Sequence, residues 1–125
     1  MRFLVVIFYI LAGTSLAFAQ PAVDHFEKKV RPLLLEKCVS CHGPKEQKSS
    51  LRLDSREALL TGGDRGAAIV PNKPAESLLL QTLAHDGEVK MPPKNKLTAA
   101  EIAAFTEWVK AGAPWPKSEG PITSK

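Results

Sequence analysis

The chain has 125 residues, and its 17 Lys and Arg against 13 Asp and Glu give a formal net charge of +4. This length corresponds to a single domain. The positive charges do not gather in a dense basic run with aromatic residues between them, so the composition gives no support to nucleic-acid binding.

The first 19 residues are expected to be a secretory signal peptide. Arg2 precedes the uncharged apolar run 3–12, and the small-residue site Ala17-Phe18-Ala19 follows. We expect cleavage after Ala19 and export to the periplasm. The apolar run is shorter than the roughly 20 residues of a membrane span, so membrane attachment is expected only if the segment stays uncleaved. The rest divides into one domain over 20–117 and a flexible C-terminal tail over 118–125.

A helix is expected from Val23 to about Cys38. Asp24 and Glu27 have the spacing of a capping box, and apolar residues follow at helical spacing. These apolar residues are Phe26, Val30, Leu33 and Leu34. Pro32 has no backbone N–H and should bend or divide the helix.

The sequence Cys38-Val39-Ser40-Cys41-His42 stands at the end of this helix. Cys-x-x-Cys-His is the attachment pattern of a c-type haem. Two thiols on one turn can reach the two vinyl groups of a porphyrin, and the next residue places an imidazole under the iron. The motif therefore predicts one covalent haem c, with Cys38 and Cys41 as thioether attachments and His42 as the proximal iron ligand.

Three other uses of paired cysteines compete with haem attachment. Structural zinc needs four ligands, so His25 and His85 would both have to converge on the pair. A thioredoxin-like dithiol normally lies beside a βαβ pattern, and a disulfide here would close only a very short loop. A buried porphyrin would supply apolar contact area that so small a domain has difficulty providing alone, so the haem is expected to be part of the fold.

Three further helices are expected after the motif. The second covers 55–60 behind an Asp54-x-x-Glu57 capping box, and the third runs from Pro74 to about Ala84. The fourth opens at a Thr98-x-x-Glu101 capping box and ends before Gly112. The first and last helices both carry an apolar face, so we predict that they pack together beside the haem edge.

A loop with the only methionine of the mature chain precedes the last helix. Met91 stands in Lys90-Met91-Pro92-Pro93, and consecutive prolines exclude helix and central strand. His and Met ligands belong to cytochromes c, so Met91 is the expected distal ligand, with a gap-filling core methionine as the alternative. His85 is the rival sixth ligand, and a solvated loop position is its other expected role.

With these parts in this order, the chain resembles class I cytochromes c. The resemblance implies a small all-α fold with about four helices around one covalently bound haem. More narrowly, the chain resembles the planctomycete-type cytochrome c domain over about Phe26 to Pro116. Among the residues that carry this resemblance are Cys38 to Gly43, Leu51-Arg52-Leu53-Asp54, Gly62-Gly63, Ile69-Val70-Pro71, Ser77-Leu78, Met91-Pro92-Pro93, Trp108 and Gly112 to Pro116. Asn72 stands where the family usually has glycine, and asparagine also tolerates positive φ.

This resemblance implies thioethers at Cys38 and Cys41, His42 as proximal ligand and Met91 as distal ligand. It also implies that a proline soon after the motif, here Pro44, accepts the free ring N–H of His42. The expected function is electron transfer in the periplasm, with iron cycling between Fe(III) and Fe(II). The protein would be a carrier and not an enzyme, and its partners would be a redox donor and a redox acceptor.

Charged residues near the cofactor are candidates for two roles. The haem propionates need partners, for which Arg52, Arg56 and Arg65 are available. A ring of lysines could steer an acidic partner to the haem edge, with scattered surface lysine as the alternative. These lysines are Lys45, Lys48, Lys90, Lys94 and Lys96.

Two other functions stay open from the sequence. An open sixth iron site could bind small molecules or reduce peroxide, with His85 as the acid-base group. Alternatively, the protein could be a haem-stabilised docking subunit of a larger complex.

Overall fold

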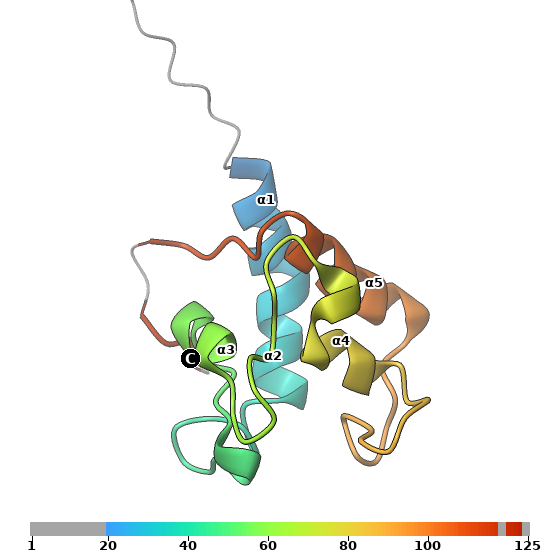
Figure 1. The fold of residues 1–125 in the computed structure, drawn as a ribbon. Coiled ribbons are helices and arrows are strands. Elements are labelled where there is room, and N and C mark those ends of the chain that lie inside the picture. Colours follow the sequence, from blue (N-terminus) through green and yellow to red (C-terminus); the bar gives the residue numbers. More distant parts are fainter. Residues whose placement is uncertain (1–19, 118–119, 124–125) are drawn as a thin grey trace, which may run out of the picture.

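The computed structural model describes residues 20–117 and 120–123, and the expected signal peptide lies outside these ranges. The described residues form helices and loops without strands, as Figure 1 shows. Isolated β-bridges pair His42 with Gln47 and Gly63 with Gly66. The prediction of a small all-α fold is therefore confirmed. Among the described helices, none has the length and apolar character needed to cross a membrane.

The N-terminal helical rod consists of α1 (Gln20–His25), a π-helical turn (Phe26–Val30) and α2 (Arg31–Lys37). The Arg31 N–H donates to the Phe26 carbonyl, five residues earlier. This wider turn ends two residues before Pro32, which can neither donate to the preceding turn nor pack closely against its carbonyl. The prediction that Pro32 would bend or divide the helix is confirmed as a division, because a new α-helix begins at Arg31 with Pro32 in its first turn.

The short helix α3 (Arg56–Thr61) begins one residue later than the sequence indicates. Its N-cap is Ser55, whose side chain accepts a hydrogen bond from the Ala58 N–H at 3.1 Å. The prediction of an Asp54 cap is wrong, because the Asp54 carboxylate is buried and accepts two hydrogen bonds from Arg52, at 3.0 and 2.6 Å.

The third predicted helix is divided into a 3₁₀ turn (Pro74–Glu76) and α4 (Leu78–Leu83). Ser77 separates them with an extended backbone, φ −84° and ψ 114°. Its buried hydroxyl accepts from the Val70 N–H at 2.9 Å and lies 3.0 Å from the Lys73 carbonyl, to which it can donate. The prediction of one continuous helix here is wrong, because the Ser77 side chain forms hydrogen bonds with backbone groups of the preceding loop.

The last helix, α5 (Ala99–Lys110), matches its prediction. Thr98 and Glu101 form both bonds of the capping box, at 3.0 and 3.2 Å. The helix packs against the π-helical turn, where the rings of Phe26 and Trp108 lie 5.7 Å apart. His25 adds a hydrogen bond from its Nε2 to the Ala104 carbonyl at 2.9 Å. The predicted packing of the first helix on the last is confirmed.

The loop before the 3₁₀ turn is joined to the end of α5 by Asn72. Its φ is 69°, so the expected tolerance of asparagine for positive φ is confirmed. The Asn72 N–H donates to the Val109 carbonyl at 2.8 Å, and its side-chain Nδ2 donates to the Lys110 carbonyl at 3.2 Å.

After α5 the chain crosses the α1–α2 rod and returns toward α3 (Figure 1). There Ile122 is 1% exposed, and its N–H donates to the Asp54 carbonyl at 2.7 Å. At this residue the structure differs from the flexible tail expected over 118–125, because an aliphatic side chain is packed into the core. The boundaries of the domain itself stay a prediction.

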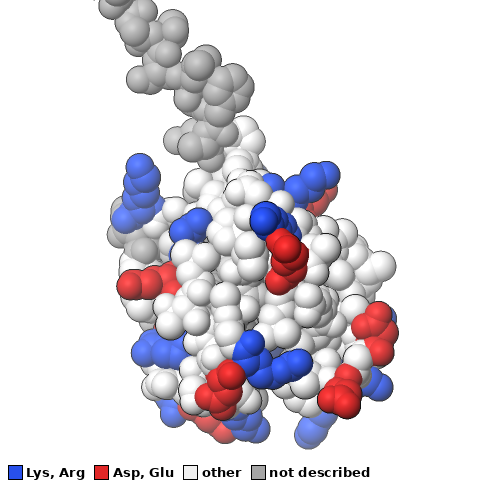
Figure 2. All heavy atoms as spheres, in the orientation of Figure 1, with Lys and Arg blue, Asp and Glu red and all other residues white. Residues whose placement is uncertain are grey.

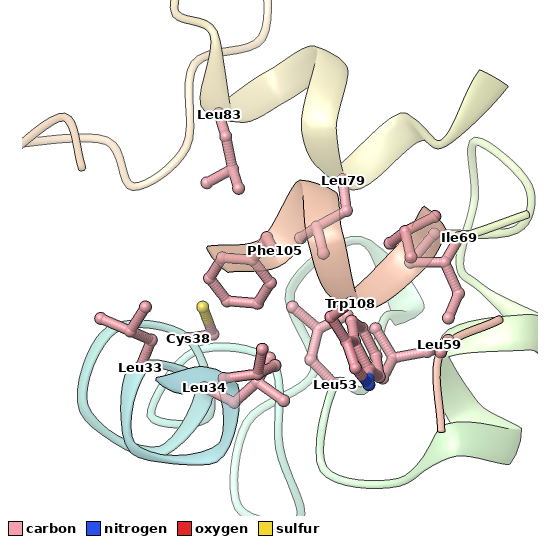
Figure 3. Packing of buried hydrophobic residues seen from close by; sticks show 14 of the residues in the cluster. Leu33, Leu34, Cys38, Leu53, Leu59, Ile69, Leu79, Leu83, Phe105 and Trp108 are labelled. Atoms are coloured by element: carbon pink, nitrogen blue, oxygen red, sulfur yellow. The ribbon is translucent and has the colours of Figure 1, made fainter. Parts of the chain in front are cut away.

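Charged side chains are scattered over the face shown in Figure 2, where Lys and Arg lie among Asp and Glu without a large area of one sign. Beneath the surface, one hydrophobic cluster joins the helices. Figure 3 shows Leu83 and Leu79 of α4 directed toward Phe105 of α5, with the sulfur of Cys38 facing the same interior region. The end of α2 therefore delivers the first motif cysteine directly to the core.

Candidate haem site

A cavity of about 230 Å³ brings the motif and the methionine loop together. Cys38, Cys41 and His42 line it from the end of α2, and Met91 lines it from the loop before α5. The rest of its wall is mainly apolar. The apolar wall residues are Leu51, Leu53, Ala68, Leu78, Leu79, Leu83, Val89, Pro92 and Pro93. All four residues predicted as haem attachments or iron ligands thus border one space.

The motif forms a single turn at the end of α2. The N–H groups of Cys41 and His42 both donate to the Cys38 carbonyl, at 3.2 and 3.0 Å. Gly43 is required directly after it, because a Cβ there would lie 2.2 Å from the Val39 carbonyl oxygen. Cys38 is buried and Cys41 is half-buried, and both are free thiols. The turn therefore offers two thiols and an imidazole to the cavity.

The environment of Cys38 argues against the competing uses of the cysteine pair. Burial raises the pKa of its thiol to about 12, with a smaller contribution from the nearby Cys41. Redox-active dithiols have a lowered pKa, and zinc is bound by the thiolate, so both uses are disfavoured here. Among residues 20–117 and 120–123, no group of three or more His, Cys, Asp or Glu side chains could hold a metal ion.

His42 is oriented by a backbone carbonyl. Its Nδ1 lies 3.0 Å from the Lys48 oxygen. Because a carbonyl can only accept, Nδ1 carries the proton and Nε2 keeps the lone pair that binds a metal. The loop after the motif folds back to allow this, since the Lys48 N–H donates to the Cys41 carbonyl at 3.0 Å. The expectation of Pro44 as acceptor is wrong, because this folding places Lys48 against the ring.

Met91 is held by the end of α4. Its N–H donates to the Thr82 carbonyl at 3.1 Å, and its own carbonyl lies 2.9 Å from Nε2 of His85. His85 is not among the residues that line the cavity. Of the two candidate sixth ligands, the structure therefore brings Met91 to the cavity and directs His85 to the methionine backbone.

The sequence of this site was compared with models of known protein families. Residues 38–95 match the family model described as planctomycete cytochrome C, and the matched span contains both the motif and the methionine loop. This segment of the chain is similar to that family. The resemblance seen in the sequence is confirmed over these residues. Searches among curated proteins and among solved structures gave no match.

Similarity to a cytochrome c family over residues 38–95 points to covalent haem c and a role in electron transfer. The residues fit this group by their chemistry. One wall carries two thiols and an imidazole whose Nε2 is unprotonated, another carries a thioether, and apolar side chains lie between them. This donor set is that of a cytochrome c with His and Met ligands.

Only one of the three candidate propionate partners borders this cavity. Arg65 lines it, whereas Arg52 is bound to Asp54. Arg56 donates to the carbonyls of Ala113 and Gly112, at 2.9 and 3.2 Å. The sequence could not separate the three, because arginines of structural and binding roles look alike without their partners.

Two lysines line the cavity, and the sequence indicated only one of them. Lys48 had been expected near the haem edge, while Lys37 had not, although it directly precedes the motif. Lys45, Lys90, Lys94 and Lys96 are not among the lining residues.

Proposed function

We propose that this protein is a periplasmic mono-haem cytochrome c that transfers single electrons, with iron held between His42 and Met91. The observation that supports this most directly is the shared cavity of the Cys-x-x-Cys-His turn and the methionine loop. When bound, haem c supplies a one-electron Fe(III)/Fe(II) couple.

The chain's own residues would keep the ligand set unchanged during electron transfer. The Lys48 carbonyl fixes the ring of His42 through Nδ1. The backbone of Met91 is held at both its N–H and its carbonyl. Apolar side chains such as Leu53, Leu79 and Leu83 exclude water from the cavity, and a low dielectric and soft thioether ligand favour a high reduction potential.

Mass and optical spectra of the purified exported protein test the proposal. We expect the mass of residues 20–125 plus one haem, and a haem that survives denaturation. We also expect a weak ferric absorption band at the red edge of the visible range, which marks methionine ligation. A colourless protein, or a haem lost to acidified organic solvent, would contradict covalent attachment.

The variant Met91→Leu separates the thioether from the packing. Leucine has a similar volume but cannot bind iron, so the red-edge band should disappear and high-spin features should replace it. Val89→Ala is the matched control, because Val89 lines the same cavity from the same loop without a ligand atom. Persistence of the band in Met91→Leu would exclude Met91 as the ligand.

We also propose that lysines at the cavity attract an acidic redox partner. Lys37 and Lys48 support this, because both border the cavity and charges near the site of electron exchange raise the encounter rate. Higher ionic strength should slow electron exchange with the partner. A rate that does not depend on salt would contradict steering.

A further inference from the structure

Backbone hydrogen bonds join the end of α4 to the methionine loop at Thr82, His85 and Met91. The Thr82 carbonyl accepts hydrogen bonds from the N–H groups of His85, at 3.3 Å, and Met91, at 3.1 Å. The Met91 carbonyl receives the ring of His85 at 2.9 Å. The residues between them, 86–90, are largely exposed. The two hydrogen bonds to Met91 therefore bind the open loop to the rigid part of the domain.

We propose that His85 is a positioning residue for Met91, and that its Nε2–H fixes the Met91 carbonyl and thereby the direction of the thioether. The inference rests on the proposed His42 and Met91 ligation. A carbonyl only accepts hydrogen bonds, so Nε2 of His85 carries the proton and is not available to iron while this bond exists.

The sequence around Met91 explains why a side chain is needed. Pro92 and Pro93 follow it and have no N–H, so the backbone after the methionine cannot donate to the rest of the domain. A side-chain donor that reaches the Met91 carbonyl replaces the missing backbone donors.

The conformation of His85 suits this task. Its φ is 58°, in the left-handed region where asparagine, aspartate and histidine are enriched among non-glycine residues. The chain reverses there at the end of α4, and the ring is turned back toward the loop.

Loss of this bond should increase the population in which the thioether is off the iron. A neutral hydrogen bond of this kind corresponds to a change of roughly 2- to 10-fold in such an equilibrium. An added ligand that competes with Met91 should then bind more tightly by the same factor, because its apparent affinity follows the population of the open state.

Imidazole binding to the ferric holoprotein, followed by the red-edge band, is the measurement. His85→Asn tolerates positive φ, but its shorter amide does not reach the Met91 carbonyl. His85→Gln can place an amide N–H near the position of Nε2. We expect a roughly 2- to 10-fold lower dissociation constant for imidazole in His85→Asn and a value near wild type in His85→Gln.

The two variants separate positioning from backbone strain. If only the backbone conformation mattered, Asn would be the better replacement, because it adopts positive φ more readily than Gln. His25→Asn is the matched control, since His25 makes the same type of bond, from Nε2 to the Ala104 carbonyl at 2.9 Å, on the α5 side of the molecule. It should leave imidazole binding unchanged.

Failure of this inference can be told from failure of the proposed function. A wild-type red-edge band together with equal imidazole binding in wild type and His85→Asn would overturn the role of His85 alone. A Gln variant that behaves no better than the Asn variant would overturn it as well. A wild-type protein without the band would exclude the Met91 ligation, and the positioning role would fall with it.

Discussion

Ile122 provides a direct test of how the C-terminal segment stabilises the domain. Its side chain is 1% exposed, and replacement of a buried isoleucine by alanine costs about 2–5 kcal/mol. Its neighbours Pro121 and Thr123 are exposed, so the segment can close partly around the space, and we expect a loss of about 2–3 kcal/mol in the free energy of unfolding for Ile122→Ala. Deletion of residues 120–125 also removes the hydrogen bond to the Asp54 carbonyl and should cost about 1 kcal/mol more.

Urea unfolding of the purified holoprotein, followed by tryptophan fluorescence, measures these losses. With a slope of about 1–3 kcal/mol/M, Ile122→Ala should lower the midpoint by about 0.7–3 M. Thr123→Ala is the matched control, because its neighbouring side chain is exposed. Equal midpoints for Ile122→Ala and Thr123→Ala would refute the burial of Ile122. The haem spectrum should stay unchanged in both, since neither residue lines the cavity.

Two further predictions concern charge and protonation at the cavity. Arg65→Gln should lower the midpoint potential by roughly tens of millivolts, because a positive charge near the iron disfavours the ferric state. Arg52→Gln should shift the midpoint potential little, since Asp54 binds that guanidinium. Potentiometric titration of the two variants measures these shifts, and equal shifts would contradict the assignment of Arg65 rather than Arg52 to the haem site. In the haem-free chain, burial raises the pKa of the Cys38 thiol from its ordinary 9.0 to about 12, so iodoacetamide should label the half-buried Cys41 first. The buried, protonated Cys38 thiol contributes to the free energy of unfolding below about pH 9, and this contribution is lost as the pH rises toward 12. Mass spectrometry should find Cys38 labelling rising over that window, and equal labelling of both cysteines at pH 8 would contradict the burial.

The sequence predicted the parts of the site whose chemistry lies in side chains. The Cys-x-x-Cys-His motif and Met91 before two prolines are local patterns with a direct chemical meaning. The Thr98 capping box and the φ of Asn72 were also predictable, because both depend on properties of single residues or short spacings.

What the sequence could not predict depends on the folded backbone. The acceptor for His42 is the Lys48 carbonyl, and every residue has such a carbonyl, so no residue type marks it. Asp54 and Ser55 are both good caps, and only burial of the Asp54 carboxylate beside Arg52 decides between them. Ile122 is a single apolar residue in a polar segment, so it has no periodicity that could indicate burial.

The π-helical turn at Phe26–Val30 sets the rotational phase of the whole N-terminal rod. A π bulge corresponds to one residue inserted into an α-helix, and each residue rotates the helix by about 100°. A chain shortened by one residue in this turn would lose that offset, and His25 would be turned by about 100° relative to α2, away from the Ala104 carbonyl that it meets on α5. Because of the extra residue, His25 at one end of the rod contacts α5 while the two cysteines after its other end line the cavity.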